Sequence, residues 1–298
     1  MPSLVVLRGG GDIATGVAWR LVHAGFAVVV LELSEPLTVR RTVALSSAVR
    51  MGTADIEGLR GFLFVNAREA VEAAQLAAAN HRAEVPVLVC PSLTSFIEAT
   101  SPPDVVVDAR LAKRNIDTAM ADAKVVIGLG PGFIAGSDVH AVVETNRGHH
   151  LGRVFWTGSA EPNTGIAAVV GGYGAQRVLR APLSGMIRWS AAIGDRVVEG
   201  QHLGTITDPT LTDPTLTDRS VTDGTTTDGT AGEKSTLTAP FSGILRGLIA
   251  DSVEVVAGMK IGDIDPRCHP SACFEISDKA LAIGGGVVEA ALVGLRNT

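Results

Sequence analysis

The chain has 298 residues, enough for two hydrophobic cores, and its 46% hydrophobic and 19% charged residues are typical of a globular protein. A net charge of -6 without a stripe of basic and aromatic residues argues against a nucleic-acid partner. No apolar run reaches the ~18 residues of a membrane span and no leader pattern is present, so we expect a cytoplasmic protein without membrane contact.

The first predicted elements form a unit typical of nucleotide binding. An apolar run at 4–7 leads into a glycine turn, an amphipathic stretch and a second apolar run that ends at Glu32. Gly9 would allow the tight turn, Gly11 would let the backbone approach a phosphate, and Asp12 would cap a helix whose positive end faces the turn. Glu32, 23 residues after Gly9, stands where a carboxylate holds a ribose hydroxyl. We predict nucleotide or dinucleotide binding here; a purely structural turn is the alternative.

Two arginines follow the second apolar run. Arg40 and Arg41 would add phosphate contacts to the glycine turn, or they form a solvated basic pair after Pro36.

The alternation of apolar runs and helical stretches continues to about residue 150. Strands are expected at 61–65, 85–90, 105–107 and 124–127, with an alanine-rich helix at 67–83. This order predicts an α/β fold, a Rossmann-like doubly wound parallel sheet over residues 1–150. Ligands of such sheets collect at the carboxyl ends of the strands.

A dense group of glycines and polar residues follows the last of these strands. Gly128, Gly130 and Gly132 would form a nest of backbone N–H groups for an anion of the cofactor. If residues 139–145 are helical, His140 and Glu144 share one face, and would act as an acid and a base or as two ligands of a metal.

Further metal ligands are available on either side of this pair. Asp138 and His149, or His150 in place of His149, would complete a metal site with His140 and Glu144. The alternative is a polar segment in which the carboxylate only orients the histidine.

The second half contains an internal repeat after a connecting segment at 151–178. Residues 179–188 match residues 237–246 at an offset of 58, and the match continues beyond them. Each copy resembles one half of a biotinyl/lipoyl-type domain, which predicts a β-barrel (barrel-sandwich hybrid) over 179–266. Lys234 lacks the flanking methionines of a biotin-carrying lysine, so we expect a scaffold or docking domain.

Two segments complete the predicted domain organisation. Thr-Asp recurs every five residues within 207–231, where too few apolar residues are present for a core, and we predict a disordered insert. Residues 267–298 are expected to form a C-terminal segment and a helix. Three cysteines are too few for a disulfide framework and agree with a reducing compartment.

Six motifs spread over the chain resemble those of the YqeB family. They are R-G-G-G-D-I-A-T-G-V-A from residue 8, E-P-L-T-V-R-R-T-V at 35–43, V-D-A-R-L-A-K-R-N at 107–115, the glycine-rich run at 128–154, S-A-E-P-N-T-G at 159–165 and I-S-D-K-A-L-A-I-G-G-G-V at 276–287. Members of this family are associated with selenium-dependent molybdenum hydroxylases. The resemblance implies an accessory protein for the maturation of such enzymes, with the hydroxylase as its client partner.

The resemblance also suggests a ligand and a further reactive residue. The nucleotide-containing cofactor would be a molybdopterin dinucleotide or NAD(P). Because a thiolate can form a selenosulfide during selenium handling, Cys273 joins His140 and Glu144 as a candidate catalytic residue; a buried, inert cysteine is the alternative.

A second class of function stays open. The alternative is an NAD(P)-dependent oxidoreductase with an incidental barrel domain, although no tyrosine–lysine pair supports hydride transfer and Tyr173 is the single tyrosine. Whether the protein is an enzyme, and whether it forms a homo-oligomer, the sequence leaves open.

Overall fold

The computed structural model describes residues 1–163, 172–208, 234–267 and 269–297. The chain divides into two compact units. Unit 1 comprises Met1–Ala168 and Ser271–Thr298, and unit 2 comprises Val169–Pro270. In the described residues no helix is long and apolar enough to cross a membrane.

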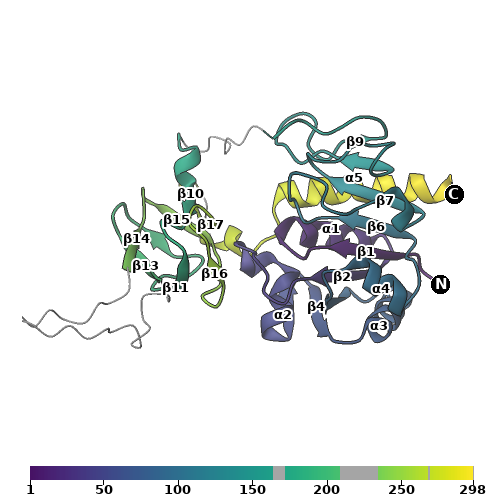
Figure 1. The fold of residues 1–298 in the computed structure, drawn as a ribbon, viewed down its shortest axis with the longest axis horizontal. Coiled ribbons are helices and arrows are strands. Elements are labelled where there is room, and N and C mark those ends of the chain that lie inside the picture. Colours follow the sequence, from purple (N-terminus) through teal and green to yellow (C-terminus); the bar gives the residue numbers. More distant parts are fainter. Residues whose placement is uncertain (164–171, 209–233, 268, 298) are drawn as a thin grey trace, which may run out of the picture. The chain divides into compact units, whose positions relative to one another are not determined.

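Unit 1 is built on a nine-stranded sheet (Figure 1). Its order is β3-β4-β5-β2-β1-β6-β7-β8-β9, and each pair from β4 to β8 runs parallel. The strands are β1 (Leu4–Arg8), β2 (Ala27–Glu32), β3 (Thr53–Ile56), β4 (Leu59–Phe64), β5 (Glu84–Val89), β6 (Val105–Asp108), β7 (Val125–Leu129), β8 (Ala141–Val143) and β9 (Val154–Phe155).

Helices cover both faces of this sheet. They are α1 (Asp12–His23), α2 (Ala48–Met51), α3 (Ala67–Ala79), α4 (Leu93–Ala99) and α5 (Asp278–Arg296). Because side chains alternate along a strand, Leu7 of β1 joins a core with α1 and α5, while Val6 joins a second core with α3 and α4. The central strands are buried on both faces, which explains their continuous runs of valine.

Helices α1 and α5 pack unusually closely because glycines form their contact. A Cβ atom on Gly16 would lie 2.5 Å from the Cβ of Ala280, and one on Gly284 would lie 2.7 Å from the carbonyl oxygen of Gly16. Arg20 Nε donates to the carbonyl oxygen of Leu281 at 3.3 Å. These contacts place the C-terminal helix in unit 1 beside the first helix of the chain.

The sheet of unit 1 was predicted to be parallel, and the strand pairing shows that this prediction was wrong at its two edge strands. The sheet is mixed, because β3 runs antiparallel to β4 at one edge and β9 runs antiparallel to β8 at the other. Glu57 and Gly58 both have positive φ angles, +46° and +80°, as a two-residue hairpin turn requires, and they reverse the chain between β3 and β4. The edge strands therefore depart from a wholly parallel doubly wound sheet.

The described residues of unit 2 form two separate four-stranded sheets, β10-β17-β15-β12 and β14-β13-β11-β16, with antiparallel pairing throughout. The strands of the first repeat are β10 (Val178–Arg180), β11 (Gly185–Trp189), β12 (Arg196–Val197) and β13 (His202–Thr207). Those of the second are β14 (Lys234–Thr238), β15 (Gly243–Leu248), β16 (Glu254–Val255) and β17 (Lys260–Asp265). Each sheet thus combines strands of both repeats.

The prediction of a biotinyl/lipoyl-like barrel-sandwich hybrid was wrong. In the described part of unit 2 the two sheets do not join into a closed barrel. Each sheet ends on a two-residue strand, β12 or β16, which is too short to extend the hydrogen bonding around a barrel. The repeat therefore predicts the strand series correctly but not the closure.

The observed units also shift the predicted boundaries. Unit 1 continues past residue 150 and also includes the chain from Ser271 onwards, so the C-terminal helix is part of unit 1 and not a separate segment. From residue 209 to residue 231, the predicted insert lies outside the described residues.

Candidate functional site

The sequence-predicted residues lie mostly at the carboxyl ends of the parallel strands of unit 1. The glycine turn follows β1, Asp108 ends β6, Gly128–Gly132 lies at the end of β7, and Glu144 follows β8. These four strands are neighbours in the sheet, so their ends share one edge. Ligands of open α/β sheets bind at such an edge.

The glycine turn has the backbone geometry expected of a phosphate loop. Gly9 has a φ angle of +97°, which favours glycine, and its N–H donates to the carbonyl oxygen of Leu31 at 2.8 Å. Gly11 is extended, with φ -67° and ψ -178°. The nearest atom to a Cβ on Gly11 would be Thr38 Oγ1 at 3.9 Å, so the space beside Gly11 is open.

The carboxylate of Glu32 holds this turn in place by hydrogen bonds to backbone N–H groups. Its Oε2 accepts the N–H of Gly10 at 2.7 Å and its Oε1 accepts the N–H of Leu33 at 2.8 Å. Burial raises the pKa of the Glu32 carboxyl, and the two backbone hydrogen bonds oppose that shift. Glu32 therefore fixes the turn, a role that the spacing rule for a ribose ligand does not include.

The first turn of α1 lacks the side-chain cap that the sequence suggests. Gly11 is the N-cap residue and Asp12 is the first helical residue, so Asp12 does not cap the helix. Within the described chain no acceptor is found for the backbone N–H groups of Gly11, Asp12, Ile13 and Ala14. These N–H groups and the helix dipole make the start of α1 attractive to an anion.

Arg40 lies against this first turn, as the phosphate-contact prediction requires. Its Nη1 pairs with Asp12 Oδ2 at 3.0 Å, and only 10% of its side chain is exposed. Its Nε and Nη2 are buried and have no hydrogen-bond partner among the described residues. Because buried donors of a cation are normally satisfied, Arg40 has unused capacity for an anion. Arg41 instead begins a short 3-10 turn (Arg41–Val43), and its carbonyl oxygen accepts the Ser47 hydroxyl.

The loop after β6 is held by a network of charged side chains, of which Arg8 and Asp108 are buried. Arg8, 2% exposed, donates to Thr118 Oγ1 at 2.6 Å and pairs with Asp117 at 2.8 Å. Asp108 accepts the Thr118 hydroxyl at 2.7 Å and pairs with Arg110 at 2.5 Å. The hydrogen bonds from Arg8 and Arg110 lower the pKa of Asp117.

This network positions a strained segment of the same loop. Leu111 and Lys113 have φ angles of +55° and +62°, which non-glycine residues adopt at a cost. Since Arg8 is bound by Thr118 and Asp117, it supports the loop.

Gly128, Gly130 and Gly132 are required by close packing. A Cβ atom at each would lie 2.4 Å from Phe133, from Thr145 and from Arg114, respectively. The structure thus explains these glycines by the approach of neighbouring loops; the predicted anion nest stays a prediction.

The predicted pairing of His140 with Glu144 was wrong. Residues 141–143 form strand β8, in which each residue advances about 3.3 Å, so the two side chains are separated along the strand. His140 Nδ1 accepts the N–H of Val126 at 3.0 Å, and burial lowers the pKa of His140.

Glu144 and the other predicted metal ligands have separate structural partners. Glu144 is fully buried and accepts the N–H groups of Thr145, Asn146 and Glu161 at 2.6–2.7 Å. Asp138 Oδ2 accepts the N–H of Ile134 at 2.9 Å. Across the described residues, no three His, Cys, Asp or Glu side chains form a group that could hold a metal, so His149 completes none.

Cys273 lies in a short 3-10 segment, Pro270–Cys273, just before α5. It is fully buried, and its carbonyl oxygen accepts the Thr42 hydroxyl at 2.6 Å. Burial of this kind agrees with the alternative of an inert cysteine and leaves selenium chemistry at Cys273 a prediction.

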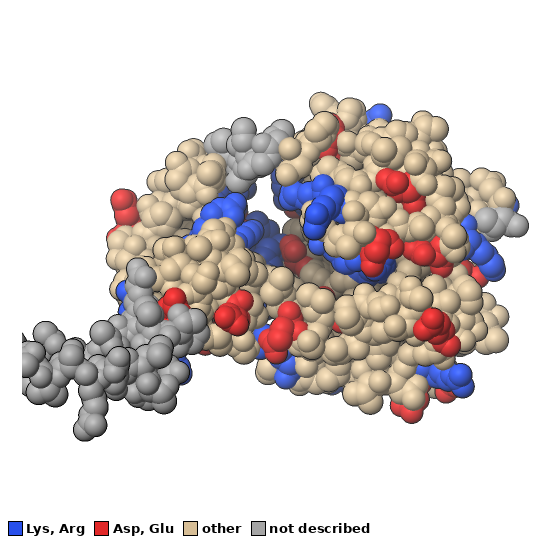
Figure 2. Space-filling model, viewed as in Figure 1, with Lys and Arg blue, Asp and Glu red and all other residues tan. Residues whose placement is uncertain are grey.

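Sequence reasoning missed Arg147 and Lys279, which the structure brings together at the start of α5. Arg147 forms two hydrogen bonds to Asp278 at 2.8 and 2.9 Å, and Lys279 follows Asp278 in the first helical turn. The sequence signal was present, since Ser277 before Asp278 and Lys279 is a typical helix start. The position of this helix start beside α1, however, depends on tertiary packing. In Figure 2, Lys and Arg side chains gather on unit 1 near the ends at which α1 and α5 begin in Figure 1.

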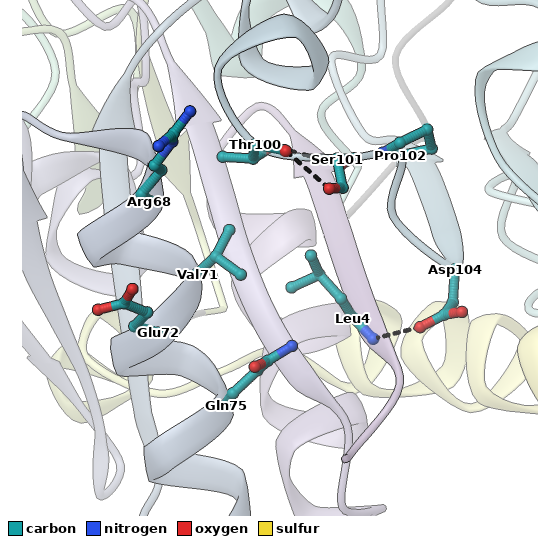
Figure 3. Close-up of a pocket in the computed structure, with 9 residues that line it drawn as sticks. All are labelled: Leu4, Arg68, Val71, Glu72, Gln75, Thr100, Ser101, Pro102 and Asp104. Atoms are coloured by element: carbon teal, nitrogen blue, oxygen red, sulfur yellow. Dashed lines mark hydrogen bonds between the residues drawn. The ribbon is translucent and has the colours of Figure 1, made fainter.

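A cavity of about 310 Å³ lies at the amino ends of β1 and β6, at the other end of the strands from the candidate site (Figure 3). It is lined by α3, by Leu4 at the start of β1 and by the segment before β6; its residues are Leu4, Arg68, Val71, Glu72, Gln75, Thr100, Ser101, Pro102 and Asp104. Leu4 N–H donates to Asp104 at 2.9 Å. None of the sequence-predicted site residues lines this cavity, so it does not belong to the candidate site.

Comparison with known proteins gives one close relative and several weak structural likenesses. No family model matches the chain. Among solved structures, an aspartoacylase family protein from Mesorhizobium loti has 11% identity and a TM-score of 0.29, over 90% of this chain and 86% of that one. A succinylglutamate desuccinylase/aspartoacylase from Rhodobacter sphaeroides has 12% identity and a TM-score of 0.27, over 88% and 85%. TM-scores of this size do not establish a common fold.

A sequence relative is the uncharacterized protein YqeB of Escherichia coli (strain K12). The two are 43% identical over 291 residues, which cover 98% of this chain and 48% of YqeB. The chain thus spans about half the length of this curated relative. The chain is therefore a homologue of YqeB, which supports its resemblance to the YqeB family.

Proposed function

We propose that unit 1 binds a phosphate-bearing, nucleotide-containing ligand at the start of α1, and that the protein acts as an accessory protein in the maturation of selenium-dependent molybdenum hydroxylases. The observation that carries the binding proposal is Arg40, nine-tenths buried against the first turn of α1 with two donor nitrogens unpartnered. The maturation role follows from the family resemblance, and the homology to YqeB supports that resemblance.

An anion at this position would satisfy three requirements at once. It would accept the N–H groups of Gly11–Ala14, occupy the open space beside Gly11, and complete the hydrogen bonding of Arg40. Asp12 opposes anion binding, but its charge is already compensated by Arg40 Nη1. A phosphate group, with several acceptor oxygens, fits these donors best.

Calorimetry with AMP, ADP, NAD and molybdopterin nucleotides tests the binding proposal. We expect Arg40→Ala to weaken binding of the tightest of these probes at least ~tenfold, a loss of about 1.4 kcal/mol. The matched control is Arg82→Ala, which removes an arginine just before β5, at the amino ends of the strands, and should leave affinity unchanged. Equal affinity of the Arg40→Ala variant and the native protein would place the ligand elsewhere.

Gly11→Val should abolish binding without disturbing the fold. The φ and ψ angles of Gly11 are accessible to valine. Among the described residues, the nearest atom to the added Cβ would be Thr38 Oγ1 at 3.9 Å, but the valine side chain would occupy the anion position. The contrasting variant is Gly10→Val, whose Cβ would lie 3.0 Å from the Ser46 nitrogen and from Val30, and which we expect to be destabilised. Thermal unfolding and calorimetry on both variants separate the two effects.

A deletion strain tests the maturation role. Without the protein, the hydroxylase polypeptide should still be made but should be inactive and deficient in selenium or in inserted cofactor. Elemental analysis of the purified hydroxylase separates these steps, since normal molybdenum with missing selenium indicates selenium insertion. Complementation with the Arg40→Ala variant should fail. Full hydroxylase activity with normal molybdenum and selenium in the deletion strain would overturn the role.

A further inference from the structure

The starts of α1 and α5 lie level with each other at the same edge of the sheet. Gly16 contacts both Ala280 and Gly284, and Arg20 contacts Gly284 and Leu281, so the helices run in the same direction and Asp12 lies level with the first turn of α5. Helices in contact lie about 8–10 Å apart, axis to axis, and contacts through glycine favour the short end of this range. One small ligand can therefore reach both helix starts.

The first carboxylate of each helix is compensated by an arginine. Asp12 pairs with Arg40 at 3.0 Å, and Asp278 receives two parallel hydrogen bonds from Arg147. A carboxylate in the first turn would otherwise repel an incoming anion. Pairing with arginine neutralises it and leaves the positive ends of both helix dipoles available.

Lys279 lies in the first turn of α5, next to Asp278. It is half-buried and makes no hydrogen bond or ion pair with any residue that the structure describes. Burial lowers the pKa of its ammonium, Arg147 and Lys113 lower it further, and Asp12 and Glu144 act in the opposite direction. Lys279 is thus a half-buried ammonium without an ion pair among the described residues, and the neighbouring carboxylates of Asp12, Glu144 and Asp278 are bound to other groups. A second anionic group would stabilise a lysine in this position.

We propose that the ligand of unit 1 carries a diphosphate, with one phosphate at the start of α1 beside Arg40 and the second at the start of α5 beside Lys279. This inference rests on the proposed phosphate site and adds the chemical class of the ligand. Arg40 supplies the buried, unpartnered donors at the first position. Lys279 supplies the charge at the second. Free pyrophosphate, a nucleoside diphosphate and a dinucleotide share this group.

Calorimetry on the full chain with phosphate, pyrophosphate, AMP, ADP and NAD tests the inference. The native protein should bind ADP at least ~tenfold more tightly than AMP, and pyrophosphate more tightly than phosphate. Lys279→Met, which keeps the apolar stem, should remove most of the difference between ADP and AMP while changing AMP affinity less than ~threefold. Lys279→Arg should retain it. The order of affinity among pyrophosphate, ADP and NAD identifies the source of the diphosphate.

The matched control is Lys124→Ala, which removes a lysine just before β7, at the amino ends of the strands, and should leave all affinities unchanged. Equal binding of AMP and ADP by the native protein would overturn the diphosphate inference but not the phosphate site. An equal loss of AMP and ADP affinity in Lys279→Met would also overturn it. Unchanged binding in Arg40→Ala would overturn the phosphate site itself, and failure of all five probes to bind would overturn both.

Discussion

Replacing Glu144 by alanine is expected to lower the thermal unfolding midpoint of the protein by on the order of 10 °C. Glu144 is fully buried, and its carboxylate accepts three backbone N–H groups, from Thr145, Asn146 and Glu161. Alanine leaves these donors without their acceptor and opens a cavity, at a cost of about 3–5 kcal/mol in the free energy of unfolding. Circular dichroism during heating measures the change.

The nearby control is Glu161→Ala. The Glu161 side chain is exposed, and its bonds to Asn146 and His150 lie at the surface, so its removal should leave the midpoint almost unchanged. If Glu144→Ala unfolds at the native temperature, the three backbone N–H groups have other acceptors. That result would return Glu144 to the list of candidate reactive residues.

The second large effect is expected from a methyl group between α1 and α5. In Gly284→Ala, the new Cβ would lie 2.7 Å from the Gly16 carbonyl oxygen and 2.8 Å from Arg20 Cγ. The first of these contacts is to backbone, so a side-chain rotation cannot relieve it. We expect a loss of about 1–3 kcal/mol, despite the better helix propensity of alanine, and a midpoint lower by about 2–12 °C.

Gly285→Ala is the matched control on the same helix. No atom in the part of the chain that the structure describes lies within 4 Å of a Cβ at Gly285, so alanine should stabilise the helix by about 0.5–1 kcal/mol. Chemical denaturation of the two variants therefore gives shifts of opposite sign. Shifts of the same sign would show that α1 and α5 do not depend on close contact at Gly284. Since the two helix starts form the proposed diphosphate site, Gly284→Ala should also weaken ADP binding.

The sequence by itself predicted the local elements of unit 1 well. The run at 4–8, the glycine turn and the helix from Asp12 are confirmed as β1, the turn and α1, and β4, β5, β6 and β7 lie close to the predicted strands. These elements are encoded by short-range signals, namely continuous valine-rich runs, glycine with a positive φ angle and helical spacing. Arg40, near in sequence to the turn, was also correctly placed beside it.

Tertiary structure alone decided the features that depend on distant partners. A short valine-rich segment is compatible with either a helix or a strand, and pairing with β7 made residues 141–143 a strand and separated His140 from Glu144. In the described part of unit 2, the strand pairing stops at β12 in one sheet and at β16 in the other, so the two sheets do not close into a barrel. Contacts between glycines more than 260 residues apart brought the start of α5, which carries Lys279, beside the start of α1. Such contacts are selected by the burial of whole helix faces, and the local pattern of residues carries no information on which faces meet.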